Sequence, residues 1–142
     1  MNTAEKNKFK DAKLMSVIVF AIKNAGRMLL VGPDENGCMG FPSKEFDGSL
    51  NGSLDDTMRR TLDGFTSSRD ATAECTGSFV ARRGDSIEVV YNFSATVADE
   101  NIRVPHVWAR PSEMKTMDLD SRTAACLKSF ELPRTGQPRL IK

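Results

Sequence analysis

The segment from residue 40 to residue 63 constrains the fold of this chain more than any other part. It begins with Gly40-Phe41-Pro42, and a residue that precedes proline is expected in an extended conformation. A glycine-containing loop follows, after which Ser53 is a good N-cap residue for a helix. Apolar residues then recur at helical spacing from Leu54 to Phe65. The segment therefore predicts a short extended piece, a loop and an amphipathic helix over residues 54–63 that packs on a sheet.

Apolar and β-branched residues predict the strands of that sheet. Residues 15–23 and 27–31 form the first expected hairpin, because Asn24-Ala25-Gly26 between them is a typical turn sequence. Residues 71–82 and 86–98 form a second expected hairpin around a short glycine-containing turn.

The last third of the chain predicts one more strand and two helical segments. We expect a short strand over residues 104–109 and a helical turn over 111–114. A final helix is expected to start at Asp120 or Ser121 and to end near residue 130. Its candidate buried positions are Ala124, Leu127 and Phe130. The order hairpin, loop, helix, hairpin, strand, helix predicts an α+β domain with a mixed sheet and helices packed on it.

The bulk properties indicate one globular domain. A chain of 142 residues with 39% hydrophobic and 27% charged residues can bury a core and is not expected to be disordered. We expect a polar N-terminal arm over residues 1–14, the domain over 15–132 and a C-terminal tail over 133–142. The formal net charge of +1 gives no general attraction to nucleic acid, and the longest apolar run is too short to span a membrane.

The cysteines indicate a reducing compartment. Cys38, Cys75 and Cys126 are odd in number and lie far apart, and no C-x-x-C spacing exists that would favour a zinc site. We expect three reduced thiols in a cytoplasmic protein, because no apolar signal core follows the lysine-containing N-terminus.

Four segments in this order resemble a Nudix domain. The end of the first hairpin, Arg27 to Val31, resembles the opening of the domain, and Gly40-Phe41-Pro42 resembles the Gly-apolar-Pro segment that precedes the Nudix box. The helix from Ser53 resembles the Nudix helix, and residues 107–114 resemble the family's tryptophan strand with the short helix that follows it. The resemblance spans residues 15–130 and implies a Nudix-like α/β/α sandwich.

The Nudix box itself is degenerate in this sequence. The family pattern G-x5-E-x7-R-E-U-x-E-E-x-G-U places glutamates on one helical face, where they bind Mg²⁺ or Mn²⁺, and these metals activate water for attack on a diphosphate. With Arg60 as the box arginine, Thr61 replaces the first glutamate, and Gly64 and Phe65 replace the acidic pair. The residues that the reaction requires are therefore missing in this alignment.

Two other alignments stay open. A shift by one residue makes Arg59 the box arginine and places Asp63 at the first position of the acidic pair, and an alignment with a gap is a further alternative. The resemblance then implies Asp63, Arg60 and Asp47 as catalytic candidates. It implies Asp63, Asp47 and Glu45 as candidate metal ligands. The expected cofactor is Mg²⁺ or Mn²⁺ if the protein is active, and none if it is not. In the simpler interpretation, Glu45 and Asp47 are exposed loop residues.

Four residues are candidates for substrate binding. Arg82 and Arg83 at the end of a strand suit a phosphate, although charged residues at a hairpin end are commonly just solvated. Phe41 and Trp108 suit stacking on a base, although a tryptophan in a strand is commonly part of the core.

Three functions follow from the resemblance and the missing glutamates. The first is a Nudix-fold protein that binds a nucleotide or another phosphorylated small molecule with weak or no hydrolysis. The second is an atypical metal-dependent hydrolase of nucleoside diphosphate derivatives, and the third is a non-catalytic scaffold, with a homodimer through the arm and first strand as one form. The sequence favours the first and third because hydrolysis requires the missing carboxylates.

Overall fold

The computed structural model describes residues 13–68, 71–98 and 101–131. The described elements, in chain order, are β1 (Lys13–Asn24), β2 (Arg27–Val31), β3 (Ser43–Asp47), α2 (Leu54–Phe65), β4 (Ala73–Arg83), β5 (Ser86–Thr96), β6 (His106–Ala109), α3 (Pro111–Met114) and α4 (Ser121–Glu131). The predicted arm over residues 1–14 and the predicted tail over 133–142 lie outside the described residues, except that residues 13 and 14 belong to β1.

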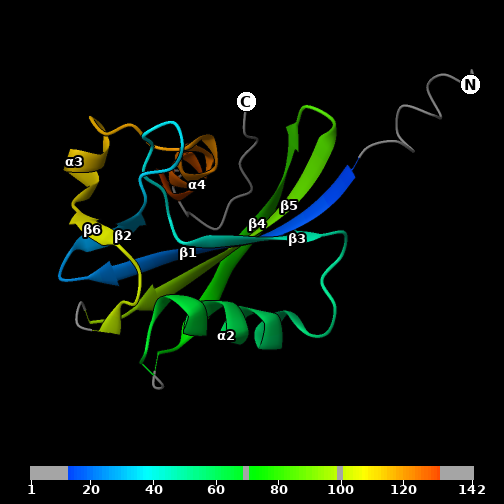
Figure 1. Cartoon of the computed structure of the whole chain (residues 1–142), viewed down its shortest axis with the longest axis horizontal. Helices are drawn as coiled ribbons and strands as arrows, with labels where there is room; N and C mark the ends of the chain where they lie inside the picture. Colours follow the sequence, from blue (N-terminus) through cyan, green and yellow to red (C-terminus); the bar gives the residue numbers. More distant parts are fainter. Residues whose placement is uncertain (1–12, 69–70, 99–100, 132–142) are drawn as a thin grey trace, which may run out of the picture.

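The sheet is mixed and is organised around β1 (Figure 1). The strand order is β4-β5-β1-β2-β6, with β3 also paired to β1. β1 runs parallel to β5 along its whole length, from Lys13 opposite Ser86 to Lys23 opposite Thr96. The other strand pairs are antiparallel. β1 thus joins every part of the sheet.

Alternate residues of β1 build two separate cores, one on each face of the sheet. Val17, Val19 and Ala21 belong to the core that also contains Met114 of α3 and Cys126 of α4. We call this side the α4 face. Ile18, Phe20 and Ile22 of β1 belong to the opposite core, which contains buried residues of α2, and we call that side the α2 face. Helices therefore cover both faces (Figure 1), and the predicted α/β/α sandwich is confirmed.

Local sequence explains helix α2 well. The backbone N–H of Asp56 donates to Ser53 Oγ at 3.1 Å, so Ser53 is the N-cap as predicted. Met58 and Leu62 are buried against the sheet, while Leu54 and Phe65 pack at the edge of the same core. The helix ends two residues later than expected.

Two predictions of local structure were wrong. Residues 43–47 form strand β3, whereas a loop was expected after the extended piece. Their sequence is mostly polar, and their pairing with β1 is a tertiary contact that a local pattern does not reveal. In α4 the buried residues are Thr123 and Cys126, whereas Ala124 is exposed and Leu127 is half-buried. The side chain of Phe130 lies outside the described residues.

Among the described residues, no helix combines the length and the apolar character needed to cross a membrane.

Candidate functional site

With Arg60 as the box arginine, the helix face that would carry the first box glutamate is buried and carries threonines. Thr57 and Thr61 are 3% and 5% exposed. The Thr57 hydroxyl donates to the carbonyl oxygen of Ser53 at 2.9 Å, and the Thr61 hydroxyl donates to that of Thr57 at 2.8 Å. Both hydroxyls are thus used within the helix, in the manner usual for threonine in a helix interior. This face presents no carboxylate.

The candidate arginines of the box have different roles. Arg59 donates from Nη1 to the carbonyl oxygen of Ala71 at 2.7 Å, so it ties α2 to the chain just before β4. Arg60 and Asp63 are both exposed on α2. Arg59 therefore holds a backbone segment in place.

The three candidate metal ligands lie on different faces of the sheet. Phe46 in β3 packs against the core on the α2 face, so its neighbours Glu45 and Asp47 point to the α4 face, because side chains alternate along a strand. Asp63 belongs to α2 on the other side. Within residues 13–68, 71–98 and 101–131, no group of three or more His, Cys, Asp or Glu residues is placed to hold a metal ion. The described residues therefore do not fit the Mg²⁺ or Mn²⁺ site of the family.

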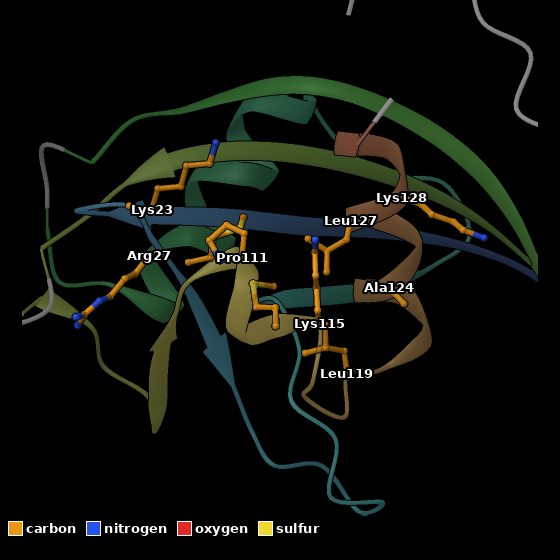
Figure 2. A pocket seen from close by; sticks show the side chains of 11 residues that line it. Lys23, Arg27, Pro111, Lys115, Leu119, Ala124, Leu127 and Lys128 are labelled. Atoms are coloured by element: carbon orange, nitrogen blue, oxygen red, sulfur yellow. The ribbon is translucent and has the colours of Figure 1, made fainter. Parts of the chain in front are cut away.

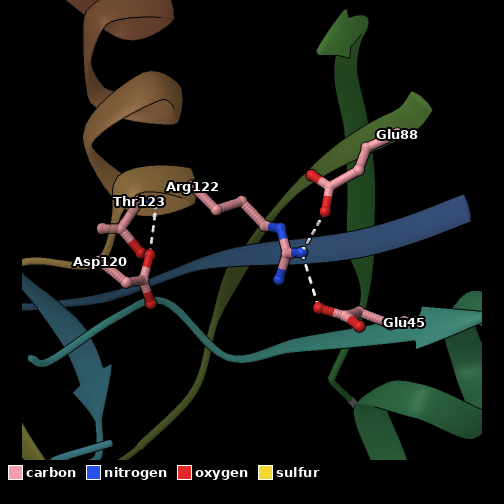
Figure 3. A network of polar contacts seen from close by, with 5 residues as sticks. All are labelled: Glu45, Glu88, Asp120, Arg122 and Thr123. Carbon is pink, nitrogen blue, oxygen red and sulfur yellow. Dashed lines mark hydrogen bonds and ion pairs between the residues drawn. The ribbon is translucent and has the colours of Figure 1, made fainter. Parts of the chain in front are cut away.

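Glu45 instead takes part in a polar network on the α4 face (Figure 3). Arg122 of α4 donates from Nη2 to Glu45 Oε1 and to Glu88 Oε1, each at 2.7 Å. The Glu88 side chain is 6% exposed and the Glu45 side chain 52%. Arg122 thus links a buried carboxylate on β5 to a solvent-facing one on β3. Asp47 makes a longer contact, 3.6 Å from Lys13 Nζ, with both side chains well exposed.

Arg122 remains charged although it is largely buried. Burial opposes the charged guanidinium, but the hydrogen bonds to Glu88 and Glu45 outweigh burial, and the pKa of Arg122 is raised. The network therefore fixes the start of α4 against β3 and β5.

A second set of contacts fixes the Gly-Phe-Pro segment to the same helix end. The backbone N–H of Phe41 donates to Thr123 Oγ1 at 2.9 Å, and Asp120 Oδ1 accepts from the backbone N–H of Thr123 at 2.7 Å (Figure 3). A Cβ atom at Gly40 would overlap the Asp120 carboxylate. The glycine is thus required by the close approach of Asp120, one of the two residues predicted to start α4.

The predicted substrate-binding residues do not form one site. Phe41 is 2% exposed and belongs to the core on the α4 face. Trp108 lies on β6 at one edge of the sheet and packs against the core on the α2 face. Arg82 is exposed on β4 at the opposite edge, and the side chain of Arg83 lies outside the described residues.

Sequence reasoning missed the Glu88–Arg122 pair. The available signal was one carboxylate in a strand whose alternate positions, Val90 and Asn92, are both buried. That signal indicates a buried partner for Glu88 but does not identify Arg122, which lies 34 residues away.

A pocket of about 600 Å³ opens on the α4 face between the β1–β2 turn, α3 and α4 (Figure 2). Its described lining consists of apolar residues and four cationic ones: Met28, Pro111, Met114, Leu119, Ala124 and Leu127, then Lys23, Arg27, Lys115 and Lys128, with Gly26 in the turn. No acidic residue is among the described residues that line it. The pocket is thus apolar inside and positively charged at its margin.

No protein-family model and no curated protein matches this sequence. Solved structures do match it. The Nudix domain of Shewanella oneidensis NrtR, in complex with ADP ribose, superposes with a TM-score of 0.62 at 18% identity, covering 92% of this chain and 97% of the other. The MutT Nudix hydrolase of Burkholderia pseudomallei gives 0.62 at 16% identity over 81% and 96%.

The MutT protein of Methanosarcina mazei Go1 gives a TM-score of 0.65 at 14% identity, covering 83% of this chain and 93% of the other. The similarity to all three structures extends over most of both chains, and the described strands and helices agree with the resemblance noted in the sequence. The chain has the Nudix fold.

Proposed function

We propose that this protein binds a nucleotide or another phosphorylated small molecule and hydrolyses it weakly or not at all. The observation that carries the proposal is the position of Thr61. In the alignment with Arg60 as the box arginine, Thr61 stands where the family has its first glutamate. Its hydroxyl is bonded within the helix and its side chain is buried.

Cleavage of a diphosphate in this family requires divalent metal ions, which neutralise charge and activate water. Mg²⁺ needs several oxygen ligands at nearly ideal octahedral positions. Glu45 and Asp47 lie on one side of the sheet and Asp63 on the other. This separation supports the proposal that these carboxylates do not bind one metal ion together. Weak binding of metal to one exposed carboxylate would not supply a comparable rate.

Binding of a nucleotide-like ligand is supported by the fold. The similar Nudix domain of NrtR was solved with ADP ribose, so a domain of this shape can hold a nucleoside diphosphate derivative. We therefore propose a binding or sensing role for this protein.

The experiment measures binding and turnover in parallel. The protein is incubated with ADP-ribose and other nucleoside diphosphate derivatives, with Mg²⁺ or Mn²⁺, and phosphate or nucleoside monophosphate release is followed. A thermal shift without turnover is expected, since a ligand selective for the native state raises apparent stability. Asp55, an acidic residue in the first turn of the helix that contains Asp63, is the control position. Metal-dependent turnover that is lost in Asp63→Ala and kept in Asp55→Ala would establish a hydrolase instead. No shift with any ligand would favour the scaffold.

A further inference from the structure

We propose that the pocket between the β1–β2 turn, α3 and α4 binds a small molecule with an apolar body and a phosphate group. The inference rests on the proposed function for the phosphate, and it adds the place of binding and the apolar character of the rest of the ligand. Because the pocket lies on the α4 face, it is separated by the sheet from helix α2.

The pocket has the size and lining of a ligand site. Its volume of about 600 Å³ lies within the range of about 300–1,000 Å³ typical of sites for small molecules. Helix α4 explains why the space is open. Ala124 and Leu127 are one turn apart and were expected to be buried, yet Ala124 is exposed and Leu127 half-buried, because both face the pocket. Apolar side chains thus remain available to an apolar ligand body.

The charges around the pocket indicate the head group. Figure 2 shows Lys115 extending across the pocket toward Leu127 and Lys23 at the margin, whereas the charged ends of Arg27 and Lys128 extend outward on opposite sides. All four residues are exposed, and none takes part in the ion pairs found among the described residues. Lys115 inside the pocket and Lys23 at its margin, which form no ion pair with a described residue, favour an anionic group on the ligand, and a phosphate monoester carries more negative charge than a carboxylate.

Helix α4 provides a blocking variant with a matched control. Ala124→Glu would place a carboxylate and extra volume inside the pocket, whereas Ala125→Glu would place the same side chain one residue further along. Ala125 is also exposed but does not line the pocket. Glutamate is a good helix former, so both variants should fold equally well, and circular dichroism and thermal unfolding check this.

The test uses 1-naphthyl phosphate as the probe and isothermal titration calorimetry as the measurement. Wild type and Ala125→Glu should bind it with similar affinity, and Ala124→Glu should lose detectable binding. Lys115→Gln should weaken binding by about tenfold, as expected for loss of one charge-assisted contact. The same substitution at exposed Arg103, outside the pocket, should change affinity by less than about twofold. Affinity should also fall with added salt, because these charges are exposed.

Control ligands test separately what the apolar body and the phosphate group of the probe contribute to its affinity. Neutral 1-naphthol and inorganic phosphate should each bind far more weakly than 1-naphthyl phosphate, and 1-naphthoate should be intermediate. Equal binding of the probe to Ala124→Glu and Ala125→Glu, or no binding to wild type, would overturn the pocket assignment. If ADP-ribose binds wild type and the probe does not distinguish the two variants, the proposed function stands and the pocket assignment fails. If the probe shows the expected pattern while no nucleotide binds, the pocket assignment stands and nucleotide binding fails.

Discussion

The hydroxyl of Thr61 donates a hydrogen bond to the carbonyl oxygen of Thr57, 2.8 Å away within the same turn of α2. This bond satisfies a buried polar group at the position that aligns with the first glutamate of the Nudix box when Arg60 is taken as the box arginine. The helix therefore keeps its structural role in covering the sheet, and its buried face carries no charge that needs a cation.

Substitution of Thr61 should separate these two roles. Thr61→Val should change the free energy of unfolding by less than about 1 kcal/mol, because the hydrogen bond within the helix contributes little. Thr61→Glu should lower it by more than about 2 kcal/mol, because a carboxylate is placed in a buried position without a counter-charge. Urea unfolding measures both values. Recovery of stability by Thr61→Glu on addition of Mg²⁺ would show that a metal site forms there.

The Arg122 network should stabilise the protein mainly through its buried half. Arg122→Met should lower the free energy of unfolding by about 3–5 kcal/mol, since it removes the guanidinium that Glu88 contacts in a buried environment. Glu45→Gln, whose side chain is 52% exposed, should cost less than about 1 kcal/mol. Chemical denaturation of both variants compares them, and equal costs would contradict the burial argument.

The contact between Gly40 and Asp120 should make residue 40 intolerant of any side chain. Gly40→Ala should lower the free energy of unfolding by about 1–3 kcal/mol, because the added methyl group overlaps the Asp120 carboxylate. Gly64→Ala is the matched control: this exposed helical glycine has open space around it, so alanine should stabilise α2 by about 0.4–1 kcal/mol. Thermal unfolding of the two variants should show shifts of opposite sign.

Cys126 should be the least reactive of the three thiols. Cys126 is fully buried, and its Sγ donates to Asn92 Oδ1 at 3.2 Å. Burial raises the pKa of the thiol from 9.0 to about 11. Arg122 lowers this pKa and Asp120 raises it, each to a smaller extent than burial does. At pH 8, iodoacetamide should modify exposed Cys75 readily and Cys126 only after unfolding, as mass spectrometry of peptides would show. Modification of Cys126 at the rate of Cys75 would contradict the structure.

The same raised pKa gives a pH dependence of stability. The thiol is neutral in both states below pH 9.0, so its contribution is fully present there. Between pH 9.0 and about 11 the unfolded thiol loses its proton while the folded one keeps it, so the free energy of unfolding falls as pH rises. Comparison of wild type with Cys126→Ala should show a shallower alkaline decline in the variant.

Much of the fold could be predicted because its elements have clear local patterns. The stripe on α2, its Ser53 cap and the apolar runs of β1, β2 and β5 are properties of consecutive residues. Strand β3 could not be predicted, since its polar sequence forms a strand through pairing with β1. The open face of α4 was also missed, because the periodicity of Ala124 and Leu127 shows an apolar side but not whether anything covers it.

The candidate site was harder to predict than the fold. Comparison of Thr61, Gly64 and Phe65 with the box pattern predicts the loss of glutamates in one alignment, and this stays a prediction. The placement of Glu45 and Asp63 on opposite faces depends on the path of the chain through β3, which the sequence does not determine. The four cations around the pocket come from three separate segments, so they form no pattern along the chain.

Titration of the protein with Mn²⁺, with free Mn²⁺ followed by electron paramagnetic resonance in the presence of ADP-ribose, shows whether the protein carries a metal site. We predict no protein site with a Kd below about 1 mM, because the described carboxylates do not converge. Tight binding of Mn²⁺ that is lost in Asp63→Ala and retained in Asp55→Ala would contradict it.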